Sequence, residues 1–225
     1  MTKTWVTIIG MTQTKPTRSY LSATERRAEI ADAAARIGVE EGLERITLRR
    51  VAEAVGVRPG LTSHYYPEAE GLVATAFVHA TDSESDALFV PDESRTPTER
   101  MAGFLDRAFS PDSAELSRLW LNARNLSRYN GALRQALTAQ ETANRRRLMA
   151  LVSAGVEAGE FRCDDIERSV ILILILVDSL TAYANEERSD ATPLVAPVVY
   201  ATTERELGLA PGSLGTGLES ADPSH

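Results

Sequence analysis

The stretch RRVAEAVGVRPGLTSHYY, residues 49–66, decides the fold of this chain. It begins as a short helical pattern, breaks at Gly56 and resumes at Pro59, which suits a first helical turn because that position needs no N–H donor. The second segment carries few apolar residues and many hydrogen-bonding ones. A helix so short and polar cannot form a core alone, so its outer side is predicted to contact another molecule.

The residues before this stretch predict two further helices. Ser22 followed by Glu25 fits a capping box, which predicts that the first helix begins there. Gly42 is placed to end that helix, and Thr47 is a candidate N-cap for the next one. One apolar face on the first helix is formed at three- and four-residue spacing by Ile30, Ala33, Ala34 and Ile37.

The rest of the chain continues as helices, without a convincing alternating strand pattern. Further helices are predicted near 67–89, 97–109, 113–128, 131–159, 165–187 and 193–207. The fold class is therefore all-α, with a three-helix head containing a helix-turn-helix and a larger helical bundle after it. The predicted divisions are a disordered or arm-like extension (1–21, with Met1 or Met11 as the start), the head (22–67), the bundle (68–207) and a disordered tail (208–225).

Charge is distributed unevenly along the chain. The formal net charge is −8, yet nine Lys or Arg and seven Asp or Glu lie between Lys15 and Tyr66, against 14 Arg and 25 Asp or Glu after Tyr66. The acidity belongs to the bundle, so the head can still approach phosphate groups. The single cysteine, Cys163, fits a reducing compartment. The apolar run at 169–180 is too short to span a membrane, and we expect a cytoplasmic protein.

Residues 26–77 resemble the first four helices of the TetR/AcrR family of transcriptional regulators, position by position. The SHYY of residues 63–66, followed by EGL at 70–72, is most similar to the BetI-type branch, and GEFRCDD at 159–165 resembles the C-terminal domain of that branch. The resemblance covers roughly residues 22–207 and implies a DNA-binding regulator.

The resemblance also implies which residues contact DNA. Arg49 would contact a base edge, since its guanidinium can bond guanine O6 and N7 together. Thr47 would contact phosphate at the start of the same helix, and Leu61 could pack on a thymine methyl group. The recognition helix would use its remaining polar residues mainly on phosphates, which set register more than sequence. The full predicted set is Thr47, Arg49, Arg58, Gly60, Leu61, Ser63, His64 and Tyr65.

Two positions depart from the family pattern. Ala69 replaces a lysine that usually opens the fourth helix, where cation and helix N-terminus both face phosphate, and Glu68 and Glu70 flank it. DNA affinity is therefore expected to be low or sensitive to salt. Thr62 stands where a larger apolar residue is common, which would loosen the small core of the head.

The second domain is expected to dimerise and to bind a small molecule. The resemblance implies a homodimer interface formed by the helices near 165–187 and 193–207. The run SVILILILV at 169–177 is apolar around most of its circumference, more than one buried face needs, and residues 193–207 add an apolar stripe, which favours that interface over a purely intramolecular core. Convergent polar groups on otherwise apolar helices favour an effector pocket. Its candidates are Phe104, Trp120, Arg124, Asn125, Gln140, Asn144, Asp178 and Tyr183.

Alternatives remain at these positions. Asp178 could hold a cationic effector or pair with an arginine across the dimer, and simple core packing explains Phe104 and Trp120 equally well. The arginines at 145–147 are interpreted as a solvated helix face.

Together these features favour a dimeric one-component transcriptional regulator, a repressor released from a palindromic operator by a small-molecule effector. One alternative is a ligand-binding or interaction module whose DNA-binding head has weakened. An enzyme is less favoured, because no catalytic motif of known spacing is present. We expect no cofactor and no metal site.

Overall fold

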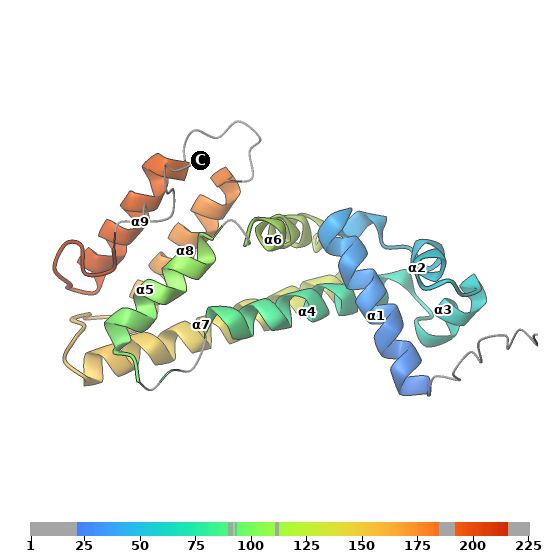
Figure 1. Cartoon of the computed structure of the whole chain (residues 1–225), viewed down its shortest axis with the longest axis horizontal. Coiled ribbons are helices and arrows are strands. Elements are labelled where there is room, and N and C mark those ends of the chain that lie inside the picture. The colour runs from blue at the N-terminus through green and yellow to red at the C-terminus, as the bar shows by residue number, and fades with distance from the viewer. Residues whose placement is uncertain (1–21, 90–91, 93, 111–112, 185–191, 216–225) are drawn as a thin grey trace, which may run out of the picture.

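The computed structural model describes residues 22–89, 92, 94–110, 113–184 and 192–215. It shows an elongated helical molecule with the short N-terminal helices at one end and the last two helices at the other (Figure 1). The elements are α1 (Ala23–Glu40), the 3-10 helix η1 (Leu43–Arg45), α2 (Leu48–Val55), α3 (Pro59–Tyr65), α4 (Ala69–Leu88), α5 (Pro97–Ala108), α6 (Ala114–Leu126), α7 (Gly131–Glu157), α8 (Ile166–Ala184) and α9 (Thr192–Glu206). The all-α prediction is confirmed.

Local signals begin and end the helices of the head where the sequence predicts. Ser22 Oγ accepts a hydrogen bond from the Glu25 N–H, and the Glu25 carboxylate accepts one from the Ser22 N–H. Thr47 Oγ1 likewise accepts from the Arg50 N–H at 3.0 Å. Gly56 adopts a left-handed φ of 74°, which lets the chain turn from α2 towards α3. Only η1 was not predicted, because three residues carry no helical period.

The head does not have a core of its own. Its buried side chains, such as Ile30, Val51 and Tyr66, belong to one cluster that continues through Leu72 and Phe77 of α4. Helices α6 and α7 extend the same cluster through Leu119, Ala123, Leu133 and Leu137. The first half of the long helix α4 is thus part of the hydrophobic core of the head.

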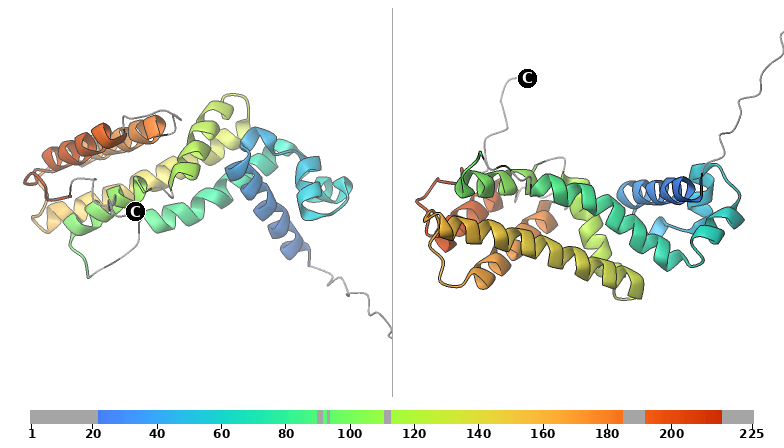
Figure 2. Two further views of the ribbon diagram at one scale, coloured as in Figure 1. Left: turned by 45° about the horizontal axis from the view of Figure 1, so that its top comes forward. Right: turned by 90° about the horizontal axis from the view of Figure 1, so that it is seen from below.

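A second core lies at the opposite end of the molecule. It joins α5, the C-terminal half of α7, α8 and α9 through side chains that include Leu105, Leu151, Ile173 and Tyr200. Helices α4 and α7 run side by side along the molecule and connect the two cores (Figure 2). Helix α7 contributes buried side chains to both cores, Leu133 and Leu137 to the first and Leu148 and Leu151 to the second.

The chain beyond α9 differs from the predicted disordered tail as far as Gly215. Residues 208–215 form turns, and Leu214 is buried in the second core. The buried Glu204 carboxylate accepts hydrogen bonds from the N–H groups of Gly212 (3.0 Å) and Leu214 (2.9 Å). These long-range contacts outweigh the Gly/Pro-rich composition that favoured disorder. The rest of the predicted tail, and the predicted extension at 1–21, lie outside the described residues.

The apolar α8 packs against α9, α7 and α6. Within the described part of the chain, no helix combines the length and hydropathy that crossing a bilayer demands.

Candidate functional site

Helix α3 presents a polar outer side and a buried inner side. Arg58, Gly60, Ser63 and His64 are exposed, whereas Leu61 and Tyr65 are half-buried. On the inner side, Thr62 and Tyr66 are buried. The buried Thr62 hydroxyl has no hydrogen-bond partner within the described chain. This agrees with the expectation that the position suits a larger apolar side chain. The outer side therefore has no role in the core.

Helix α2 packs against α3 and carries two arginines in ion pairs at its start. Arg49, whose side chain is 83% exposed, contacts Glu53 one turn later with Nε at 2.9 Å from Oε1. Arg50 pairs with Glu41 beyond the end of α1, and the hydrogen bond from this pair raises the pKa of the Arg50 guanidinium. Because Arg49 is exposed and its pair is solvated, little free energy is needed to separate it from Glu53.

Arg27 of α1 holds the end of α3 in place. Its Nη1 donates a hydrogen bond to the Tyr65 carbonyl oxygen at 3.4 Å, and its guanidinium lies 4.7 Å from the centre of the Tyr66 ring. The sequence does not predict this contact, because nothing local connects Arg27 with a helix that begins more than thirty residues later.

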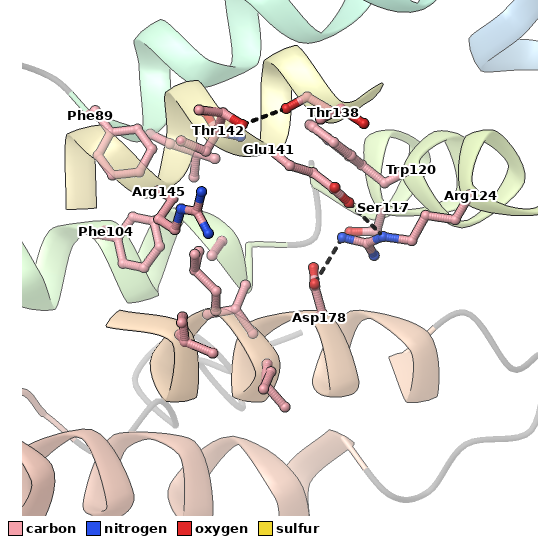
Figure 3. A pocket seen from close by; sticks show the side chains of 17 residues that line it. Phe89, Phe104, Ser117, Trp120, Arg124, Thr138, Glu141, Thr142, Arg145 and Asp178 are labelled. Carbon is pink, nitrogen blue, oxygen red and sulfur yellow. Dashed lines mark hydrogen bonds and ion pairs between the residues drawn. The ribbon is translucent and has the colours of Figure 1, made fainter. Parts of the chain in front are cut away.

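A cavity of about 380 Å³ lies between the end of α4 and helices α5 to α8 (Figure 3). Phe89 and Phe104 stack at one end of it, with ring centres 5.1 Å apart. Aliphatic side chains of α8 cover one wall. The lining residues are Leu88, Phe89, Phe104, Ala108, Ser117, Trp120, Arg124, Thr138, Glu141, Thr142, Asn144, Arg145, Ile171, Leu174, Ile175, Val177 and Asp178. An apolar cavity of this size with a few polar groups is typical of a small-molecule site.

The other end of the cavity holds a cluster of charges, visible in Figure 3 as two dashed contacts. Arg124 of α6 places Nη2 at 2.8 Å from Asp178 Oδ2 and Nε at 3.2 Å from Glu141 Oε1. The same guanidinium lies 5.9 Å from the centre of the Trp120 ring. Asp178 therefore pairs with an arginine of its own chain, so it does not need an arginine from across a dimer.

Five of the eight predicted pocket residues line this cavity, namely Phe104, Trp120, Arg124, Asn144 and Asp178. Two of the other three, Gln140 and Asn125, do not line it. Gln140 donates a hydrogen bond to Asp82 of α4 at 2.7 Å, and Asn125 is exposed on α6. The Tyr183 side chain lies outside the described residues.

The sequence does not predict several of the lining residues, among them Glu141 and Arg145. Helix α7 is rich in polar residues on every side, and periodicity alone does not show which side faces a cavity. The prediction that residues 145–147 form a solvated helix face is wrong at Arg145, because this side chain lines the cavity. Arg147 bridges to Asp86 of α4, and Arg146 is exposed.

The described residues contain no group of three or more His, Cys, Asp or Glu side chains arranged to hold a metal ion.

Sequence comparison finds a relative among transcriptional regulators. The HTH-type transcriptional regulator BetI of Rhizobium meliloti is 27% identical to this chain over 158 residues, which are 69% of this chain and 75% of that protein. No family model matches the chain.

Solved structures share the fold. A TetR transcription regulator from Haloarcula marismortui superposes with a TM-score of 0.68 and 20% identity, over 82% of this chain and 97% of that one. A regulator from Saccharomonospora viridis, solved in complex with choline, gives a TM-score of 0.66 and 16% identity over 78% and 94% of the two chains. The fatty acid degradation regulator FadR from Bacillus halodurans gives 0.61 and 22% over 77% and 92%.

Proposed function

We propose that this chain, a TetR-family transcriptional regulator, acts in the cytoplasm as a homodimeric repressor that a small-molecule effector releases from a palindromic operator. The observation that carries the proposal is the polar outer side of α3. On this helix Thr62 and Tyr66 are the buried residues, so the exposed ones are not needed for the core. Gly56 ends α2 and Pro59 begins α3, which forms the turn between the two helices. A short exposed helix held by the two helices before it has the form that enters a major groove.

The proposed DNA contacts follow from this placement. Arg49 is exposed near the start of α2 and can exchange Glu53 for a base edge. Arg58 and Gly60 stand at the start of α3, where Gly60 has open space around it and permits close approach of the backbone. Thr47, Leu61, Ser63, His64 and Tyr65 complete the proposed set.

The proposed dimer interface is formed by α8 and α9. Val198 of α9 remains 56% exposed in the single chain, and Ile171 (40%) and Ile175 (55%) of α8 are exposed where they also line the cavity. A partner that covers them would bury apolar area and offset its cost in water. A two-fold dimer would also hold two copies of α3 about 34–36 Å apart, the spacing of successive major grooves.

Helix α6 supports the proposed link between effector and DNA. On one side it carries the cavity residues Ser117, Trp120 and Arg124. On the other, Asn122 Oδ1 accepts a hydrogen bond from the Leu43 N–H at 2.8 Å, and Asn122 Nδ2 donates to Glu44 Oε2 at 3.0 Å. An effector that binds one arrangement of α6 better would therefore bias the position of the head.

The test is a fluorescence-anisotropy titration against DNA from upstream of the gene for this chain, with excess nonspecific competitor and at several salt concentrations. Specific binding that weakens as salt rises supports the repressor. Arg49→Ala should weaken binding by about 1–3 kcal/mol and relax base preference at one position per half-site. An equal loss on all sequences would show that Arg49 contacts only phosphate.

The second candidate function is a ligand-binding or interaction module with a weakened head. Ala69 favours it, because this residue opens α4 exposed to solvent between the exposed Glu68 and Glu70. Failure to bind the upstream DNA and every fragment of a genome-wide library would select this second function.

A further inference from the structure

Among the charged side chains that line the cavity, Arg145 is the one without a partner in the described part of the chain. Its guanidinium points into the cavity at the end where Phe89 and Phe104 lie (Figure 3). Within the described part of the chain, no hydrogen bond, ion pair or ring contact involves Arg145. Glu141, one turn earlier on α7, is at the usual spacing for a helical ion pair but contacts Arg124 instead. The aromatic end of the cavity therefore carries an uncompensated positive charge.

Such a charge beside an apolar wall favours an anionic ligand. Partial removal from water makes an unpaired guanidinium costly, and a carboxylate offsets that cost through charge-assisted, often bidentate, hydrogen bonds. Phe89, Phe104 and the aliphatic residues of α8 would meanwhile bury an apolar body. The two kinds of contact together require an amphipathic molecule.

A cationic ligand fits this cavity less well. The carboxylates that would attract a cation, Glu141 and Asp178, both already contact the Arg124 guanidinium. The same guanidinium also lies near the ring of Trp120, whose face a quaternary ammonium group would need. A cation would share both carboxylates and the Trp120 ring with Arg124, at the end of the cavity away from the two phenylalanines.

We infer that the effector is an amphipathic monocarboxylate, with its apolar body between the phenylalanines and α8 and its carboxylate on Arg145. The inference rests on the proposed function for the cavity's role as effector site. Taking roughly 30 Å³ for the liquid volume of one water molecule, the cavity holds on the order of a dozen non-hydrogen atoms. A hydroxyl on the body would also supply the donor that the buried Asn144 Oδ1 lacks.

Trp120 makes direct measurement possible. The chain has two tryptophans, so in a Trp5→Phe background all indole fluorescence comes from the cavity. This protein would be titrated with decanoate and with decyltrimethylammonium, which share an alkyl chain and differ in the sign of the head group. Decanoate should change the fluorescence saturably and bind at least ten-fold more tightly than the cation.

Variants then locate the carboxylate. Arg145→Gln should weaken decanoate binding about ten- to a hundred-fold, the loss expected for a hydrogen bond to a charged group. Arg145→Lys should retain most of the affinity, since it keeps the charge. The matched control is Arg146→Gln, which changes an exposed neighbour outside the cavity and should bind as the parent does.

Three results would overturn the inference: tighter binding of decyltrimethylammonium, equal affinities of the Arg145→Gln and Arg146→Gln variants, or no saturable binding of decanoate. Because the titration contains no DNA, it is independent of the repressor proposal. Saturable, Arg145-dependent binding that fails to release operator DNA would contradict induction and leave the ligand class standing.

Discussion

Single residues set the strength of the proposed DNA contact. Without DNA, Arg49 forms a solvated ion pair with Glu53. DNA binding would exchange one partner for another, so Arg49 contributes less binding free energy than an unpaired arginine would. Ala69 adds no compensating charge at the start of α4, although the backbone N–H groups of a helix N-terminus attract phosphate there. The head therefore has the shape of a DNA reader with fewer electrostatic contacts than that shape allows.

Ala69→Lys should restore one such contact. We expect tighter binding to every DNA sequence and a salt dependence steeper by about one counterion, because a phosphate contact carries no sequence information. Anisotropy titrations from low to high salt measure both effects. Ala69→Gln, which adds length without charge, is the control; if it performs as well as the lysine variant, charge is not what position 69 lacks.

At the scale of elements, α6 occupies the decisive place between cavity and head. Its inner residues Leu119 and Ala123 belong to the core that the head shares with α4, while Trp120 and Arg124 line the cavity. Asn122 contributes both its acceptor and its donor to the η1 segment. Within about two turns, α6 therefore carries side chains that line the cavity and a side chain that contacts the head.

Asn122→Ala should lower the free energy of unfolding by about 1–3 kcal/mol, since the Leu43 N–H is left without its acceptor. Asn125→Ala, exposed on the same helix, should change it by no more than about 0.5 kcal/mol. Urea denaturation measures both variants. Equal stabilities would mean that water replaces the Asn122 acceptor.

The same variant tests the coupling. With Asn122 removed, saturating decanoate should reduce operator affinity by a smaller factor than it does in the parent protein. An unchanged factor would indicate that the ligand acts on the head through α4 alone.

At the scale of the whole molecule, the two cores lie at opposite ends and the exposed aliphatic residues lie on α8 and α9, far from the head (Figure 1). Dimerisation at that end would leave both heads free to face DNA. It would also make their separation depend on α4 and α7, which connect the ends.

Val198→Asp should convert the proposed dimer to a monomer, because a carboxylate would be buried without a partner in the proposed α8–α9 interface. Sedimentation velocity measures the change, and operator affinity should fall with it, since one head contacts one half-site. Tyr129→Asp is the control: Tyr129 is 80% exposed but lies at the end of α6. A dimer that survives the Val198 substitution would place the interface elsewhere.

The bounds of the helices in the head follow from local sequence signals alone. Ser22 with Glu25, Thr47, Gly56 and Pro59 act through hydrogen bonds and backbone angles that close within a few residues, so their effects can be recognised without the fold. The polar outer side of α3 was predictable from composition, because residues 58–66 carry few apolar and many hydrogen-bonding side chains.

Which polar residues share the cavity depends on the tertiary packing and cannot be predicted from local sequence. Gln140 and Arg145 both lie on α7, yet one contacts α4 and the other points among Phe89, Phe104 and α8. Leu214 likewise packs into the second core despite its Gly/Pro-rich surroundings. Helical periodicity states that two residues lie on different sides of a helix, but what each side meets depends on packing between segments far apart in the chain.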